Sequence, residues 1–119
     1  MPKTVLLIED NVEQLERWTS EIQDDGYEVI CADSIEKALE VFPQMQWDAV
    51  VVDGCIGGDD FNSPPLIREI KTKVKEGCPI IAATKNPDLA TLMLEAGCTH
   101  AARKKDHVPG FVHSILRRP

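Results

Sequence analysis

The sequence predicts an α/β domain in which five parallel strands alternate with five helices. Short apolar runs rich in Val, Ile, Leu and Ala alternate with longer amphipathic segments along the chain, which is typical of repeated βαβ units. Several of these runs also end directly in acidic or hydroxyl residues. Because parallel strands end at one edge of a sheet, those polar side chains are expected to meet in a single cleft.

Composition narrows the class of protein. The 119 residues suffice for one hydrophobic core, so we expect a single domain over residues 1–119 with no effector domain. A net charge of -7 argues against nucleic acid as a partner, because phosphate backbones demand clustered Lys and Arg. No apolar stretch approaches the roughly 20 residues that cross a bilayer, and no secretory signal begins the chain. We expect a cytoplasmic protein whose partner is another protein or a cation, not a membrane.

The four cysteines do not form a C-x-x-C pair, which argues against a zinc site. They are expected to be small buried hydrophobic residues in a reducing compartment.

The five predicted strands share short length and apolar composition. They are Thr4–Ile8, Glu28–Cys31, Ala49–Val52, Ile80–Ala83 and His100–Arg103. The first, third and fourth are nearly continuous runs of aliphatic residues, so they should be covered on both faces of the sheet.

The first two helices are bounded by recognisable signals. The first runs from about Asn11 to Asp25 and is closed by Gly26. The second is expected to open with Asp33 and Glu36 at capping-box spacing and to end at proline 43.

Proline marks the start of the next two helices. The Ser63 hydroxyl is expected to cap the third helix, with Pro64 in its first position. Asn86 and Pro87 take the same places in the fourth. A fifth helix is predicted from apolar residues at helical spacing, followed by the pair Arg117 and Arg118: Val108, Phe111, Val112, Ile115 and Leu116.

The polar residues at the strand ends suggest a magnesium site. Glu9 and Asp10 follow the first strand, and Asp53 follows the third. Mg²⁺ prefers hard oxygen ligands, so these carboxylates and the main-chain carbonyl of Cys55 would make a suitable half-shell. Without metal, the carboxylates should repel one another and raise at least one pKa.

The same edge suits phosphoryl transfer. A carboxylate that attacks phosphorus needs its charge offset, because the incoming oxygens are also anionic. Lys104 is expected to pair with Asp53 at rest and with a phosphoryl oxygen after transfer. The Thr84 hydroxyl can donate to another phosphoryl oxygen.

Each residue alone also has a structural interpretation. Asp10 and Glu13 have capping-box spacing, Asp53 precedes a glycine as in many turns, and Lys104 lies in a charged run. These interpretations do not explain why a pair of acids, a third acid, a hydroxyl and a lysine follow the first, third, fourth and fifth predicted strands in turn. The combination therefore favours a shared site.

Four segments together resemble the receiver domain of two-component response regulators: LLIEDN, VVVD, IIAAT and AGCTHAARK. The resemblance covers essentially the whole chain. It implies a CheY-like, flavodoxin-like doubly wound sheet in the order 2-1-3-4-5. By position it implies that Glu9 and Asp10 bind Mg²⁺, Asp53 accepts the phosphoryl group, Thr84 reads it and Lys104 pairs with it.

The resemblance further implies a phosphohistidine donor, on a sensor histidine kinase or a phosphotransfer protein, and a downstream protein target. Such a receiver is not an enzyme beyond its own phosphorylation and dephosphorylation. Formation of a homodimer stays open.

The sequence departs from the family pattern at four positions. Gly57 replaces a proline in the loop from Cys55 to Pro65, and Lys85 replaces a small residue after Thr84. Ala101 replaces the aromatic residue that moves during activation. Lys105 replaces the proline that follows the family's lysine through a cis peptide, so a trans peptide is expected, since cis costs roughly 3 kcal/mol before other residues.

These features lead to a primary hypothesis and two alternatives. The primary hypothesis is a phosphorelay receiver that signals through altered protein binding, with an atypical switch. The first alternative is a receiver-like docking module that acts independently of phosphorylation, as the departures suggest. The second is a hydrolase with an aspartyl intermediate, for which Asp59 and Asp60 are the only candidate acids.

Overall fold

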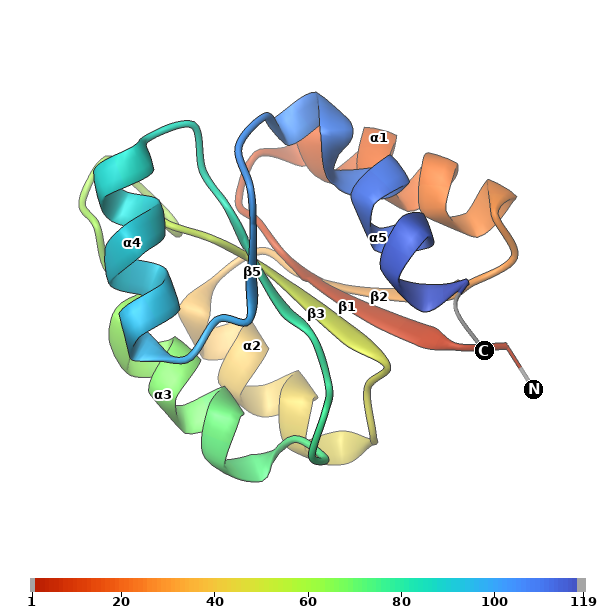
Figure 1. Cartoon of the computed structure of the whole chain (residues 1–119), viewed down its shortest axis with the longest axis horizontal. Helices are drawn as coiled ribbons and strands as arrows, with labels where there is room; N and C mark the ends of the chain where they lie inside the picture. Colours follow the sequence, from red (N-terminus) through yellow and green to blue (C-terminus); the bar gives the residue numbers. More distant parts are fainter. Residues whose placement is uncertain (1, 118–119) are drawn as a thin grey trace.

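A computed structural model describes residues 2–117 of the chain (Figure 1). Its strands are β1 (Thr4–Ile8), β2 (Glu28–Ala32), β3 (Ala49–Asp53), β4 (Ile80–Ala83) and β5 (His100–Ala102). Its helices are α1 (Val12–Asp24), α2 (Ile35–Val41), α3 (Pro64–Lys73), α4 (Pro87–Ala96) and α5 (Val108–Leu116), with short 3-10 helices η1 (Phe42–Gln44) and η2 (Lys105–His107). The five strands are parallel in the order β2-β1-β3-β4-β5, which confirms the predicted fold.

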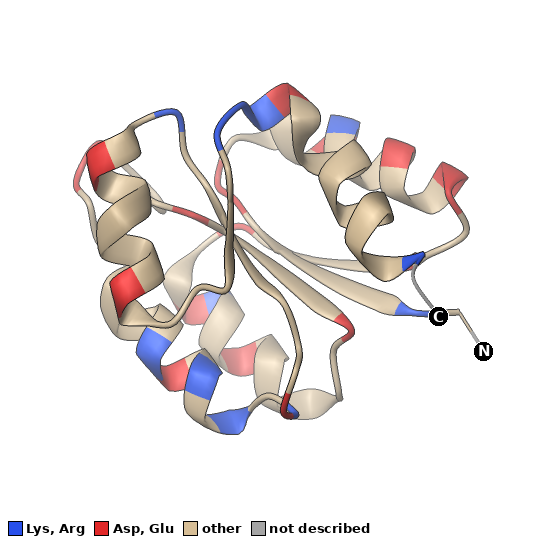
Figure 2. Ribbon diagram, in the orientation of Figure 1, with Lys and Arg blue, Asp and Glu red and all other residues tan. Residues whose placement is uncertain are grey.

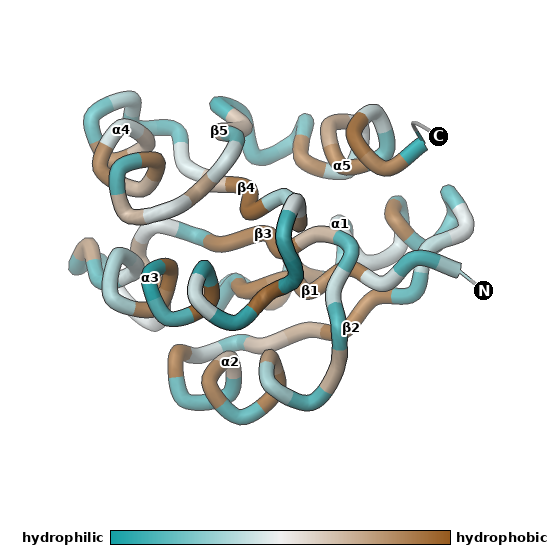
Figure 3. The backbone as a smooth tube through the Cα atoms, turned by 60° about the horizontal axis from the view of Figure 1, so that its bottom comes forward, coloured by the Kyte–Doolittle hydropathy of each residue, from teal (hydrophilic) through white to brown (hydrophobic). Residues whose placement is uncertain are grey.

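Helices cover both faces of the sheet (Figure 1), with α1 and α5 on one face and α2, α3 and α4 on the other. Successive residues of β1 serve opposite faces: Val5 and Leu7 pack with α1 and α5, while Leu6 and Ile8 pack toward the other three helices. Figure 3 shows the resulting band of hydrophobic strands between the helical layers. The core therefore lies on both sides of β1 and β3, which explains their continuous apolar sequence.

The start of α1 agrees with the prediction, whereas the cap of α2 differs from it. Asn11 caps α1, and its side chain accepts a hydrogen bond from the main-chain N–H of Gln14. Ser34 caps α2 in place of Asp33, accepting from the N–H of Lys37. The carboxylate of Asp10 is thus not needed to begin α1, which removes one structural interpretation of that residue.

The two proline-led helices are capped differently. Asn86 accepts from the N–H groups of Asp88 and Leu89, as expected. Ser63 stands at the start of α3, but its hydroxyl is buried without a hydrogen-bond partner among the described residues. The prediction of a Ser63 cap is wrong: Ser63 has helical backbone angles (φ -79°, ψ -25°) in place of the extended angles of a capping residue, and Pro64 and Pro65 have no N–H group to donate. At the end of α5, Arg117 is the C-cap residue, and Arg118 lies outside the described residues.

Two of the four cysteines are buried as predicted, whereas Cys31 and Cys55 are half-buried. All four are free thiols, and Cys78 and Cys98 are buried. Burial raises the pKa of Cys78 to about 11 and that of Cys98 to about 12, so both stay protonated at neutral pH. Within residues 2–117, the only cluster of potential metal ligands contains carboxylates and no thiol.

Charged residues lie mainly on the outer surfaces of the helices and at the ends of the strands (Figure 2). Acidic residues mark the ends of β1 and β3, and basic residues follow β4 and β5 at the same edge of the sheet. Over residues 2–117 the helices are all too short or too polar to span a bilayer.

Candidate functional site

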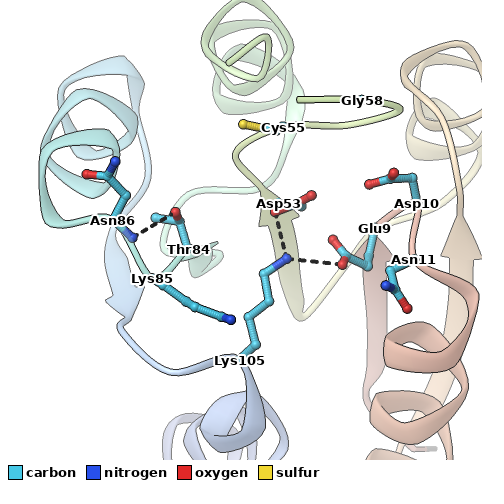
Figure 4. A pocket seen from close by; sticks show the side chains of 10 residues that line it. All are labelled: Glu9, Asp10, Asn11, Asp53, Cys55, Gly58, Thr84, Lys85, Asn86 and Lys105. Carbon is cyan, nitrogen blue, oxygen red and sulfur yellow. Dashed lines mark hydrogen bonds and ion pairs between the residues drawn. The ribbon is translucent and has the colours of Figure 1, made fainter. Parts of the chain in front are cut away.

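The carboxyl edge of the sheet holds an open pocket of about 370 Å³ (Figure 4). Residues that are far apart in sequence line it, from the ends of β1, β3 and β4 and from η2: Glu9, Asp10, Asn11, Asp53, Cys55, Gly58, Thr84, Lys85, Asn86 and Lys105. The convergence of the acidic residues and Thr84 agrees with the arrangement predicted from the sequence. Lys104 is not among the lining residues.

Three carboxylates form the acidic side of the pocket. Glu9, Asp10 and Asp53 each offer an oxygen atom, and these atoms lie within 4.8 Å of one another. Glu9 is 1% exposed and Asp53 6% exposed, whereas Asp10 is half-buried. Such a set of hard oxygen ligands, closed on the protein side and open on the pocket side, matches the preference of Mg²⁺.

Glu9 is the most perturbed group of the site. Its side-chain Oε2 is buried without a hydrogen-bond partner among residues 2–117, while Oε1 accepts from Lys105. Burial, followed by the closeness of the negatively charged Asp53 carboxylate, raises the pKa of Glu9 to about 8. A bare site therefore retains a proton at neutral pH, and a cation would replace that proton.

Lys105 supplies the ammonium of the site. Its Nζ lies 3.1 Å from Oδ1 of Asp53 and 3.1 Å from Oε1 of Glu9 (Figure 4). Burial lowers the pKa of Lys105, but the carboxylates of Asp53 and Glu9 outweigh it and leave the pKa above its ordinary value. The lysine is thus a cation held between two buried acids.

This pairing corrects the assignment of Lys104 as the partner of Asp53 at rest. Lys104 is exposed and has extended backbone angles (φ -122°, ψ 125°), and η2 begins at the next residue. All peptide bonds among residues 2–117 are trans, as expected for a lysine in place of the family's proline. The chain is extended at Lys104, and the side chain of the next residue, Lys105, lies in the pocket.

The hydroxyl side of the pocket is formed by the end of β4. Thr84 is 8% exposed, and its Oγ1 accepts a hydrogen bond from the N–H of Asn86 at 3.2 Å. The hydroxyl proton of Thr84 is therefore left for an anion in the pocket. Lys85 is exposed, and its side chain lies at the mouth of the pocket, extending toward Lys105 (Figure 4).

The loop after β3 closes the remaining wall. Cys55 is half-buried, and burial together with the charge of Asp53 raises the pKa of its thiol, so the thiol stays protonated. Asn62 holds the loop through two hydrogen bonds with Ile56. Its Oδ1 accepts from the main-chain N–H of Ile56 at 2.8 Å, and its Nδ2 donates to the carbonyl oxygen of Ile56 at 2.7 Å. Gly57 has φ +84°, which proline could not adopt, so this departure follows from the loop's path.

The aromatic residue of the family's switch has no counterpart at its usual position. Ala101 lies in β5 opposite Ala82 and packs, partly buried, against the core. Its methyl group cannot rotate between an inward and an outward position.

The comparisons with known proteins agree with this geometry. The sequence model of the response regulator receiver domain matches residues 5–108. The chain belongs to this receiver family. A search of curated proteins gave no match.

Solved receiver structures show the same fold at low identity. A two-component response regulator from Clostridium difficile superposes with a TM-score of 0.83 at 18% identity, covering 98% of this chain and 97% of that one. The chemotaxis protein CheY4 of Vibrio cholerae gives 0.81 at 20% identity, with 99% and 98% covered. The receiver domain of a Pseudomonas aeruginosa sensor histidine kinase, solved with magnesium in its active-site cleft, gives 0.79 at 22% identity, with 99% and 100% covered.

Proposed function

We propose that this receiver accepts a phosphoryl group on Asp53 from a phosphohistidine, with Mg²⁺ as cofactor, and signals by a change in its affinity for a protein partner. The observation that carries this proposal is the pairing of Asp53 with Lys105 in a pocket that also holds two further carboxylates and a hydroxyl. The donor would be a sensor histidine kinase or a phosphotransfer protein.

The residues of the pocket fit a magnesium ion. Carboxylate oxygens of Glu9, Asp10 and Asp53 would hold it, and the main-chain carbonyl of Cys55 remains the predicted fourth protein ligand. The buried Oε2 of Glu9, which has no hydrogen-bond partner among the described residues, would coordinate the ion and so no longer be unsatisfied. When bound, the ion supplies positive charge that offsets the approach of an anionic phosphoryl group.

The transfer step uses groups already in place. A carboxylate oxygen of Asp53 attacks phosphorus, the new O–P bond forms, and the P–N bond to the donor histidine breaks with its electrons returning to the imidazole. Lys105 then exchanges its contact with Asp53 for one with a phosphoryl oxygen. The Thr84 hydroxyl donates to another oxygen of the same group.

Before transfer Lys105 must give up its contacts with Asp53 and Glu9, which costs free energy. Metal binding at Glu9 would compensate that carboxylate when the lysine moves toward the phosphoryl group. Lys105 would therefore have a partner both before transfer, at Asp53 and Glu9, and after it, at the phosphoryl group.

The docking-module alternative is supported by Ala101. Without an aromatic side chain at that position, a receiver could bind its partner equally well in both states. This alternative predicts that replacing Asp53 with Ala leaves partner binding unchanged.

The decisive experiment is incubation with phosphoramidate or acetyl phosphate and Mg²⁺, followed by intact mass measurement. We expect one added phosphoryl group in the parent and none in Asp53→Ala. Phosphorylation that persists in Asp53→Ala, or its absence from the parent, contradicts the proposal. Steady turnover of a generic phosphoester would instead indicate the hydrolase alternative.

A further inference from the structure

We infer that Trp18 is a positioning residue for Lys105: the indole N–H of α1 fixes the main chain from which the lysine reaches Asp53. This inference rests on the proposed function, because it assigns Trp18 a part in phosphoryl transfer. Trp18 itself does not touch Asp53, and it acts only through Lys105.

The contact is direct, and its donor side chain is buried. Trp18 is 0% exposed, and its Nε1 donates to the carbonyl oxygen of Lys105 at 2.8 Å. The same carbonyl accepts the main-chain N–H of Val108, which leads into α5. The Lys105 carbonyl therefore joins α1 to the start of α5, and loss of the indole bond would still leave it one partner.

The lysine needs such support because its own segment is weak. It begins η2, which has only three residues, and 3-10 turns of this length have poor hydrogen-bond geometry. Its Nζ must meet two oxygens, each at 3.1 Å, from the end of a flexible four-carbon side chain. A small shift of the main chain would move the ammonium away from one or both acids.

A second tie between α1 and this segment is weaker. Arg17 and Asp106 form an ion pair at 2.8 Å, but their side chains are 52% and 73% exposed. Exposed pairs contribute about 0–1 kcal/mol and are screened by salt. Among the described contacts of α1 with η2, the buried bond of Trp18 is the one suited to hold Lys105.

Trp18 is also a core residue of the layer formed by α1, α5 and the sheet, and packing alone could explain it. Trp47 provides a matched control. It is 1% exposed, and its Nε1 donates to the carbonyl of Phe42 at 2.9 Å, in the core on the other face of the sheet. It precedes β3, at the end of that strand opposite Asp53. Phe at either position removes one hydrogen bond from an indole N–H to a main-chain carbonyl and a similar volume of buried side chain.

The test is a double-mutant cycle on the rate of phosphorylation by phosphoramidate with saturating Mg²⁺. We expect Trp18→Phe to lower the rate roughly tenfold, equivalent to about 1.4 kcal/mol. Trp47→Phe should stay within about twofold of the parent at a comparable loss of melting temperature. In a Lys105→Ala background, Trp18→Phe should have no further effect, because its action passes through the lysine.

Equal rates for Trp18→Phe and the parent, or a full additional loss in the Lys105→Ala background, would overturn the inference. If Trp18→Phe does not fold, 3-benzothienylalanine at position 18 keeps the shape of the ring and removes only the N–H donor. The same two outcomes then decide the question.

A second measurement is independent of phosphorylation and so separates this inference from the proposed function. The rate of amine acetylation at Lys105 is followed by peptide mass spectrometry, with exposed Lys104 as the internal reference. We expect Lys105 to react more slowly than Lys104 in the parent, and severalfold faster in Trp18→Phe but not in Trp47→Phe. If the parent is not phosphorylated, the proposed function fails, but the acetylation rates still decide whether Trp18 holds Lys105 in place. An unchanged acetylation rate of Lys105 in Trp18→Phe rejects the positioning role of Trp18.

Discussion

The ammonium of Lys105 lies 3.1 Å from a carboxylate oxygen of Asp53, and the side chain of its neighbour Lys104 lies outside that pocket. Two adjacent residues of the same type therefore have different environments. Lys105 is held between two buried acids, whereas Lys104 is exposed. This difference provides a direct test of which lysine serves the site.

We expect Lys105→Ala to lower the rate of Asp53 phosphorylation by about 10- to 100-fold, because one charge-assisted contact to the phosphoryl oxygens is lost. The phosphorylation-dependent change in partner affinity should also disappear, a coupling role predicted from the sequence for Lys104. Lys104→Ala is the matched control and should stay within about threefold of the parent. The measurement is the rate of mass gain with phosphoramidate and Mg²⁺; equal losses for the two variants would contradict the assignment.

The raised pKa of Glu9 predicts a pH-dependent stability in the absence of metal. The folded state holds the Glu9 proton up to about pH 8, whereas the unfolded chain releases it near its ordinary value of 4.5. Between these values the folded state binds more protons, so the contribution of Glu9 to stability falls as the pH rises. Replacing Glu9 with Gln removes this penalty.

We therefore expect Glu9→Gln to be more stable than the parent at pH 8.5 by on the order of 1 kcal/mol or more, since each pKa unit is equivalent to about 1.4 kcal/mol. Near pH 4.5 the difference should vanish. Urea unfolding at both pH values, with a chelator present, measures the two free energies. A constant difference across this range would show that burial does not perturb Glu9 as described.

Magnesium should stabilise the folded chain through the three carboxylates. A ligand that binds only the folded state at ten times its Kd adds about 1.4 kcal/mol to the free energy of unfolding. We expect the melting temperature to rise with millimolar Mg²⁺ at pH 8, and to rise less at pH 6, where the Glu9 proton competes with the metal. Glu9→Gln should lose most of the response, and the absence of any shift in the parent would argue against the metal site.

The fold was predictable from the sequence because its signals are local and repeated. β1 and β3 are covered on both faces of the sheet, so their residues are almost all aliphatic, and this composition identifies them in the sequence. Caps were less predictable where two suitable residues adjoin: Asp33 and Ser34 can both accept a hydrogen bond, and backbone angles decide in favour of Ser34. Local patterns thus identify the elements but not always their first residue.

The limits of local sequence patterns also explain which residues of the site were predictable. Glu9, Asp10 and Asp53 were predictable because each lies at the end of a strand or within two residues of it, where the sheet fixes the position of the chain. Lys105 was not, because the segment after β5 leaves the sheet and its path depends on distant contacts. One of these is the bond from Trp18, which lies 87 residues away along the chain and has no signal in the local sequence.

Lys85 gives a last prediction, concerning the lifetime of the phosphorylated state. Its side chain lies at the mouth of the pocket, beside Thr84 and close to the path by which water or another protein would reach a phosphoryl group on Asp53. A long cationic side chain there can shield the phosphoryl group and pair with its oxygens, so we expect Lys85→Ala to speed hydrolysis about two- to tenfold. The decay of labelled Asp53 after removal of the donor measures this rate. Lys104→Ala removes a nearby charge from outside the pocket, so it should leave the decay unchanged if shielding by Lys85 is specific. Identical decay in Lys85→Ala and the parent would show that the substitution of a small residue by lysine has no effect on the phosphoryl lifetime.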